Sequence, residues 1–270
     1  MFTDPTIGAI LLGAIQGLTE FLPVSSTGHV FLFETYLGLV PDENLALWLH
    51  IGSLAAVVVY FWEEIVELIG GLYKTIIERQ SNPEGDYALK LLVATVLTFP
   101  TAMLVRAVYP YSELSLALIG TTLIITAGLI FIAEKRLFAL TSAAQSLSWR
   151  LVIILGLVQG FAVLPGISRS GLTIALLVWL GVNRQLSAKT SFLLSIPTIA
   201  GATLFTYLEQ GELFYRLGFF EITAVISSAV FAYVAIVWMM RLIGGRWIYF
   251  VPYCATLGAV VLVISFVTGA

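Results

Sequence analysis

Residues 16–29 read QGLTEFLPVSSTGH and concentrate polar side chains within an otherwise apolar region. Pro23 and Gly28 disfavour a continuous helix through this stretch, whereas the flanking residues 7–15 and 30–39 are mostly hydrophobic. In hydrocarbon an unsatisfied polar group costs several kcal/mol, so such a stretch is tolerated only inside protein or beside a water-filled cavity. The stretch is therefore predicted to form a functional site.

A second stretch, residues 156–173 (GLVQGFAVLPGISRSGLT), aligns with residues 13–30 (GAIQGLTEFLPVSSTGHV) if a one-residue gap is placed on each side of the proline. The alignment superposes Gln159 on Gln16 and Pro165 on Pro23. This internal repeat predicts a single membrane domain, residues 1–270, built from two related halves at about residues 6–134 and 150–268.

The composition identifies an integral membrane protein. The chain is 59% hydrophobic and only 11% charged, whereas soluble domains carry about 25% charged residues. Long apolar runs such as residues 114–133 and 251–267 favour transmembrane helices over a β-barrel. The single cysteine, Cys254, excludes a disulfide within the chain.

We predict an all-α polytopic protein with six transmembrane helices and two re-entrant helix-loop-helix elements. A helix over residues 6–21 would be about 22 Å long, which falls short of the roughly 30 Å hydrocarbon core. We therefore expect it to end before Pro23 and the chain to return over residues 30–39. Residues 151–163 and 172–181 repeat this plan around the PGISRSG loop. The predicted spans are residues 45–68, 91–108, 114–133, 188–208, 219–240 and 248–267, with a polar loop at 73–90 and a linker at 135–150.

Each half thus crosses the membrane an odd number of times, so the two halves are predicted to insert in opposite orientations, as in inverted-repeat transporters. Most lysines and arginines fall on one side of this arrangement, which the positive-inside rule assigns to the cytoplasm. We expect a multi-pass plasma-membrane protein with both termini and the mouth of the first loop on the extracytoplasmic side.

The polar stretches suggest specific chemistry. Arg169 lies among glycine, serine and apolar residues, where a guanidinium requires an anion, and its planar fork suits a phosphate. Ser168, Ser170 and Thr173, with the start of the following helix, add donors for that anion. The alternative for Arg169 is a purely structural ion pair with Glu20.

Ser26 and His29 are three residues apart, so a turn would bring the hydroxyl near an imidazole base, with Glu20 orienting the imidazole. The alternatives are a hydrogen-bonded loop histidine and a serine that caps the returning helix. The nucleophile stays open among Ser25, Ser26, Thr27 and His29, and we favour Ser26.

These two stretches resemble the signature regions of the undecaprenyl-pyrophosphate phosphatases, also called the bacitracin-resistance protein family. Gln16 and Glu20 match the motif Glu/Gln-x-x-x-Glu, residues 23–29 match PVSSTGH, and residues 165–173 match PGxSRSxxT. The resemblance extends to residues 191–202 (SFLLSIPTIAGA). It implies an enzyme that converts undecaprenyl diphosphate to the monophosphate carrier of envelope-glycan synthesis.

The resemblance also implies site residues. The implied catalytic residues are Glu20, Ser26, His29 and Arg169, and the implied substrate-binding residues are Gln16, Ser25, Thr27, Gly166, Ser168, Ser170 and Thr173. A divalent cation, Mg²⁺ or Ca²⁺, is implied with Glu20 as its ligand. Because residue 16 is Gln, only one anionic side chain is available, so no tight protein cage is expected. His50 and the Glu63, Glu64 and Glu67 group are expected to mark interfaces or a solvated face.

The expected partners are a polyprenyl diphosphate lipid and the bilayer, with no nucleic acid, and a homodimer is one option for the oligomeric state. Two rival functions use the same features. A lipid-phosphate transporter or flippase would need the broken helices but not a Ser26–His29 pair. An intramembrane serine protease would need that pair but not Arg169.

Overall fold

The computed structural model describes residues 5–37, 43–109, 114–138, 143–210, 218–245 and 247–269. Apart from one isolated bridge between Ala144 and Val182, the described residues contain only helices and loops. The helices are α1 (Pro5–Phe21), α2 (Ser26–Leu37), α3 (Glu43–Tyr60), α4 (Trp62–Ile76), α5 (Pro83–Val108), α6 (Leu116–Phe138), α7 (Trp149–Gln159), η2 (Gly160–Val163), α8 (Arg169–Trp179), α9 (Arg184–Gln210), α10 (Phe219–Leu242), η4 (Trp247–Tyr249) and α11 (Phe250–Thr268). The predicted all-α class is confirmed.

Within the described residues, five helical segments are long and apolar enough to cross a membrane: α5, α6, α9, α10 and η4–α11. They confirm five of the predicted spans. In the sixth, residues 45–68, α3 and α4 are bent by 80° around Phe61, so the pair makes a sixth crossing only if it is one broken span. Phe61 is buried, whereas Glu63, two residues later, is exposed and Glu64 is partly exposed. The bend keeps these carboxylates out of the apolar core while the ring enters it.

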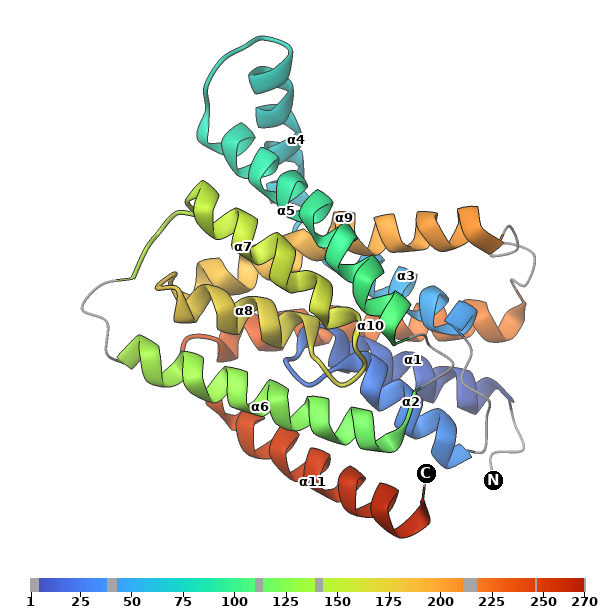
Figure 1. The fold of residues 1–270 in the computed structure, drawn as a ribbon. Helices are drawn as coiled ribbons and strands as arrows, with labels where there is room; N and C mark the ends of the chain where they lie inside the picture. The colour runs from blue at the N-terminus through green and yellow to red at the C-terminus, as the bar shows by residue number, and fades with distance from the viewer. Residues whose placement is uncertain are drawn as a thin grey trace.

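The predicted polar loop at residues 73–90 is also wrong, because α4 continues to Ile76 and α5 already begins at Pro83. Asn82 caps α5 by accepting a hydrogen bond from the Gly85 N–H at 2.7 Å, and its side-chain amide donates to the Gly71 carbonyl at 3.1 Å. These bonds close a helical hairpin that projects from the bundle (Figure 1). The polar loop is therefore confined to residues 77–82, and Lys74, Glu84, Asp86 and Lys90 lie on helices.

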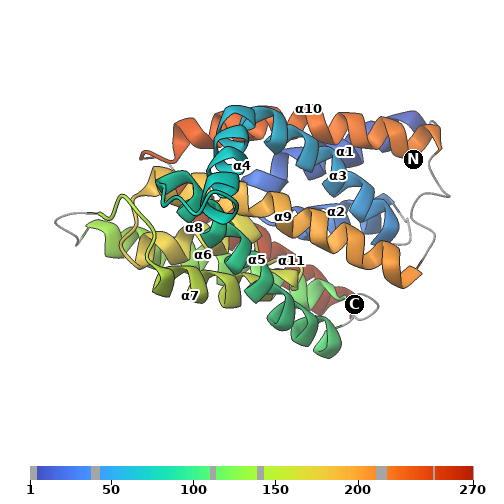
Figure 2. The same ribbon diagram turned by 90° about the horizontal axis from the view of Figure 1, so that it is seen from above.

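Two short helix pairs, α1–α2 and α7–α8, enter the bundle from opposite ends and turn back near its middle (Figures 1 and 2). The two turns lie where the sequence predicted them, and the re-entrant course of these pairs in a membrane stays a prediction. The returning helices begin earlier than predicted, at Ser26 and Arg169, so residues 26–29 form the first turn of α2 and not a loop. The end of the predicted first return, residues 38 and 39, lies outside the described residues.

Glycines at aligned positions of the repeat allow close helix packing. Gly17 of α1 lies so near α10 that a Cβ would overlap the backbone oxygen of Ser228. Its counterpart Gly160 follows α7, and a Cβ there would lie 2.7 Å from the backbone nitrogen of Ala102 in α5. The two halves thus make matched contacts, α1 with α10 and α7–η2 with α5. The opposite orientation of the halves in a membrane stays a prediction.

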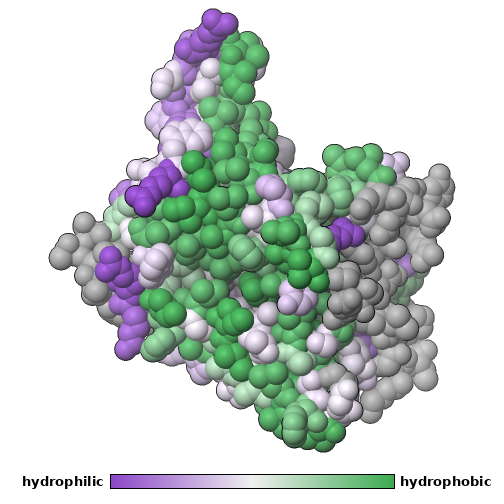
Figure 3. All heavy atoms as spheres, in the orientation of Figure 1, coloured by the Kyte–Doolittle hydropathy of each residue, from purple (hydrophilic) through white to green (hydrophobic). Residues whose placement is uncertain are grey.

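The outer surface suits a lipid environment. Apolar side chains cover most of the middle of the face seen in Figure 3, and hydrophilic residues gather at the tip of the α4–α5 hairpin and at one end of the bundle. Large hydrophobic residues such as Phe99, Phe131 and Trp238 are exposed on the long helices. The chain is therefore a multi-pass membrane protein.

Candidate active site

The two polar turns contact each other at the centre of the bundle. Ser25 adopts a left-handed conformation with φ of 69°, and its hydroxyl oxygen accepts hydrogen bonds from the Gly28 N–H at 3.3 Å and the Gly166 N–H at 3.0 Å. The Ser170 hydroxyl donates to the Leu22 carbonyl at 3.0 Å. Residues about 140 positions apart thereby form one unit.

Helix α6 supports the second turn with two threonines that the sequence did not single out. The Thr122 hydroxyl donates to the Pro165 carbonyl at 2.6 Å, and the Thr126 hydroxyl donates to the Gly166 carbonyl at 3.0 Å. Gly166 has a φ of 87°, and a Cβ there would also collide with Thr122, so glycine is required. In the sequence, the hydroxyl side chains of these threonines within the otherwise apolar run 114–133 were the feature that could have pointed to this role.

Glu20 is the centre of the hydrogen-bond network. Its Oε1 accepts from Arg169 Nη2 at 2.6 Å, and its Oε2 accepts from the Ser26 hydroxyl at 2.6 Å and from Gln16 Nε2 at 2.9 Å. The residue is only 6% exposed. A carboxylate at this depth requires such compensation, because charge-assisted hydrogen bonds offset the loss of hydration.

Both terminal nitrogens of the Arg169 guanidinium donate hydrogen bonds. Nη2 contacts Glu20 and Nη1 donates to the Ser191 carbonyl at 3.1 Å, while the guanidinium carbon lies 5.9 Å from the centre of the Phe21 ring. The ion pair that was the alternative interpretation of Arg169 is therefore present. Because both partners also line a cavity, the pair is placed to meet a ligand.

The predicted Ser26–His29 hydrogen bond is wrong. The Ser26 hydroxyl donates to Glu20, and the His29 ring uses both nitrogens elsewhere. Nδ1 donates to the Ser25 carbonyl at 2.8 Å, and Nε2 accepts from the Tyr253 hydroxyl of α11 at 2.7 Å. Placement in the first turn of α2 directs the imidazole away from the serine. His29 is thus held by hydrogen bonds, as in the alternative interpretation. Helix α2 is capped by Ser25, not by Ser26.

His50 of α3 lies in the site, although the sequence predicted an interface or solvated position. Its Nε2 lies 3.5 Å from Glu20 Oε2. A histidine in the middle of an apolar span was the signal that marked it.

The site opens into a cavity of about 480 Å³. Its polar end includes Glu20, Ser26, His50 and Arg169, together with Ser25, Thr27 and Ser168 of the predicted substrate-binding set. The remaining wall runs between α5 and α9 and is largely apolar, with residues such as Val96, Phe99, Met103 and Phe205.

Four residues predicted to bind substrate do not line this cavity: Gln16, Gly166, Ser170 and Thr173. Gln16 donates to Glu20, and Gly166 and Ser170 join the turns. The Thr173 hydroxyl donates to the Arg169 carbonyl at 2.8 Å and lies 2.6 Å from the Ser191 hydroxyl. The geometry gives all four a supporting position, and a direct contact with substrate stays a prediction for them.

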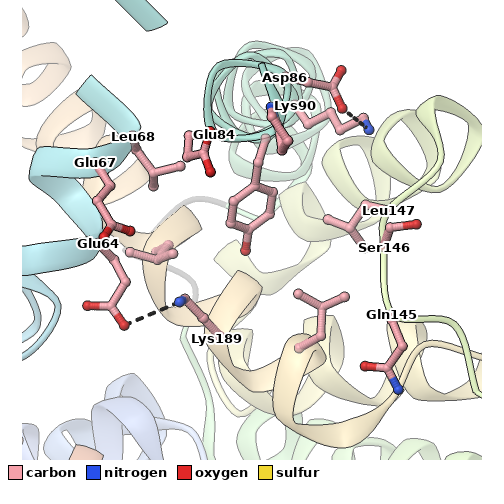
Figure 4. Close-up of a pocket in the computed structure, with 14 residues that line it drawn as sticks. Glu64, Glu67, Leu68, Glu84, Asp86, Lys90, Gln145, Ser146, Leu147 and Lys189 are labelled. Carbon is pink, nitrogen blue, oxygen red and sulfur yellow. Dashed lines mark hydrogen bonds and ion pairs between the residues drawn. The ribbon is translucent and has the colours of Figure 1, made fainter. Parts of the chain in front are cut away.

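A second cavity of about 340 Å³ lies among α4, α5 and α9 (Figure 4). Glu64 and Lys189 form an ion pair across it at 3.2 Å, and Lys90 pairs with Asp86. Glu64 and Glu67, which the sequence predicted to mark an interface or a solvated face, therefore line a charged groove. None of the predicted catalytic residues takes part in it.

The residues present do not fit a divalent cation held by protein ligands. Glu20 is the only carboxylate among the predicted site residues, and hydrogen-bond donors already occupy both of its oxygens. The Arg169 guanidinium and the His50 imidazole also lie against it. Within the described residues, no group of three or more His, Cys, Asp or Glu side chains is placed to hold a metal ion. Glu20 as a metal ligand thus stays a prediction that this geometry does not favour.

The comparisons with known proteins agree with one another. A family model described as bacitracin resistance protein BacA matches residues 9–260. A protein of Methanosphaera stadtmanae named undecaprenyl-diphosphatase is 34% identical over 97% of this chain and 98% of its own length. Proteins of the same name from Desulfatibacillum aliphaticivorans and Desulfosudis oleivorans are 35% and 36% identical, over 96% and 95% of this chain and 98% and 97% of theirs.

Proposed function

The chain belongs to the bacitracin resistance protein BacA family, and from this premise we propose that it is a phosphatase acting on undecaprenyl diphosphate. The products are inorganic phosphate and the lipid monophosphate that carries envelope glycans during their synthesis. The names of the relatives favour hydrolysis over the lipid-phosphate transporter that the broken helices also suit. The same names also disfavour the alternative of an intramembrane serine protease.

One observation carries the mechanism: the Ser26 hydroxyl donates to Glu20 at 2.6 Å inside the cavity that Arg169 also lines. Glu20 is the proton acceptor of the only hydrogen bond that this hydroxyl makes in the described structure. The Ser25 hydroxyl oxygen is engaged as an acceptor between the two turns. Ser26 is therefore the better-placed nucleophile, and Glu20 is its base.

The reaction follows from this arrangement. Ser26 Oγ attacks the outer phosphorus in line with the bridging oxygen while its proton passes to Glu20 Oε2. The bond to the bridging oxygen breaks and releases the lipid monophosphate, and water then hydrolyses the phosphoserine to free phosphate. Arg169 neutralises charge on the phosphoryl oxygens, because its fork matches two of them. A Mg²⁺ or Ca²⁺ ion, where present, would lie on the diphosphate oxygens.

The cavity also suits the lipid part of the substrate. Its apolar wall between α5 and α9 continues from the polar end and accepts an isoprenoid chain while the diphosphate stays at Arg169. The cationic residues Lys135 and Arg136 lie at the end of α6, opposite the end where α1 begins and α11 ends (Figure 1). From this charge distribution and the positive-inside rule we propose that the chain ends and the mouth of the first turn face the extracytoplasmic side of the plasma membrane.

The test measures phosphate release from a C55 diphosphate by the purified protein, with and without a chelator. Wild type should release phosphate and Ser26→Ala should lose at least about 100-fold in kcat, because no nucleophile remains. Thr121→Ala removes an exposed hydroxyl that bonds only within α6, and it should match wild type. Full activity of Ser26→Ala would exclude the serine as nucleophile. Mass measurement of the same sample decides the oligomeric state, including the homodimer.

A further inference from the structure

Helix α4 has an exposed apolar face that the proposed mechanism does not use. Five large side chains recur along this helix at intervals of three and four residues and are each 51–63% exposed: Trp62, Val66, Ile69, Tyr73 and Ile76. At about 100° per residue they fall within an arc of about 80°. They therefore form one continuous band along α4, which we call the α4 stripe.

The rest of the α4 surface has a different character. Glu63 and Glu67 are exposed and occupy the arc beside the stripe. On the remaining side, Leu68 packs against the core of the bundle, and a Cβ added to Gly71 would lie 2.6 Å from the backbone nitrogen of Gly85 in α5. Helix α4 thus has one face packed on protein, one charged face and one exposed apolar face.

The bend between α3 and α4 sets the level of α4 in a membrane. Helix α3 has 18 residues and is therefore about 27 Å long, which nearly matches the roughly 30 Å hydrocarbon core. Helix α4 turns away from it by 80°. Over its 15 residues α4 therefore advances only about 4 Å along the axis of α3. If α3 crosses the hydrocarbon, α4 runs along the membrane surface that α3 has reached.

The orientation of the hairpin agrees with this placement. The α4–α5 hairpin projects sideways from the long helices of the bundle (Figure 1). In Figure 3 its hydrophilic residues lie on the side where the bundle also has its hydrophilic end, and its apolar residues lie on the opposite side. The apolar side of the hairpin is thus turned toward the level of the lipid-facing surface of the bundle.

The size of the stripe favours lipid over protein as its partner. A stable protein interface needs about 800 Å² from each partner. The stripe is about 21 Å long and one helix, about 10 Å, wide, so its area is only about 200 Å². Such a narrow band is typical of a helix that lies in the boundary between water and lipid. Its exposed aromatic residues, Trp62 and Tyr73, are of the types enriched at that boundary.

We propose that α4 is an interfacial helix whose stripe lies between the lipid headgroups and the acyl chains of one leaflet, while Glu63 and Glu67 stay in water. In the broken span α3–α4, α3 then covers the depth of the hydrocarbon and α4 holds the base of the hairpin on the surface. The partner of the stripe is a lipid surface. This goes beyond the proposed function, because none of the catalytic residues is involved.

The experiment measures the depth of spin labels on cysteine variants in phosphatidylcholine vesicles, from their accessibility to O₂ and to a water-soluble nickel chelate. Labels on Val66→Cys and Tyr73→Cys should have equal depths, within about 5–10 Å of the headgroup boundary. Glu67→Cys is the matched control on the charged face and should be accessible to the chelate. Val230→Cys, exposed in the middle of α10, should lie deep in the hydrocarbon. Wild type gives the background, because its single cysteine, Cys254, is buried.

Two results would overturn the proposal. A helix that crosses the bilayer would separate the Val66→Cys and Tyr73→Cys labels by about 10 Å in depth, because seven residues rise by that distance. A stripe covered by a second copy of the chain would exclude both reagents, and about tenfold dilution of the protein in lipid would then raise its accessibility to O₂. Neither measurement depends on turnover, so the outcome is separate from success or failure of the proposed function.

Discussion

At the scale of single residues, Glu20 explains why a charged group is stable at the centre of this bundle. Its carboxylate receives hydrogen bonds from Gln16, Ser26 and Arg169, which come from α1, α2 and α8. A buried ion pair is favourable only when its remaining hydrogen-bonding capacity is satisfied. The same bonds orient Ser26 and Arg169 toward a common cavity. In the proposed mechanism, one side chain therefore both stabilises the buried pair and takes part in catalysis.

The fork of Arg169 yields the first prediction. Arg169→Ala should lower kcat by about 10²–10³-fold or more, because a preorganised donor to the phosphoryl oxygens is removed. Arg169→Lys should recover little of this, since an ammonium cannot reach two phosphate oxygens in the planar geometry of a guanidinium. Initial rates on a C55 diphosphate provide the measurement. A lysine variant with normal kcat would contradict phosphate clamping.

The second prediction concerns His29. Because its Nδ1 holds the Ser25 carbonyl and its Nε2 faces Tyr253, we expect it to act by fixing the turn before Ser26. His29→Ala should lower kcat about 10-fold or more at every pH without removing a limb of the pH profile. Tyr253→Phe keeps the ring and should lose less than about threefold. A limb that disappears in His29→Ala would instead place the imidazole in proton transfer.

At the scale of helices, the glycines of α1 decide how closely it packs. Gly17→Ala would place a methyl group against the backbone of Ser228 and Ala232 in α10. Overpacking of this kind costs about 1–3 kcal/mol, so the melting temperature in detergent should fall by several degrees. Gly8→Ala lies in the same helix, where the nearest atom is 3.9 Å away, and it should be neutral or stabilising. Equal melting temperatures for the two variants would count against close α1–α10 packing.

At the scale of the whole molecule, the distribution of charge predicts the orientation in the membrane. Cys254 is buried, so wild type should not react with a membrane-impermeant thiol reagent. In intact cells Thr268→Cys, at the end of α11, should be labelled from outside. Ser81→Cys, in the turn of the α4–α5 hairpin, should be labelled only after permeabilisation. The reverse pattern would invert the topology and place the active-site mouth in the cytoplasm.

The amino-acid sequence by itself determined the class of the protein and most of its elements. Hydropathy located five spans, and Pro23 and Pro165 located the two turns, because these signals act on neighbouring residues and need no tertiary context. The motif positions Glu20, Ser26 and Arg169 were identified as a site, and they do meet.

Only the tertiary structure decided how the remaining parts are arranged. At the bend between α3 and α4, the Phe61 ring lies 6.4 Å from the ring of Phe192 in α9, between centroids, and no local pattern encodes that distant partner. His29 turns toward Tyr253, 224 residues away, and His50 reaches Glu20 from another helix. The direction of a polar side chain in a membrane is set by whichever helix offers it a hydrogen bond, and that neighbour exists only after the chain has folded.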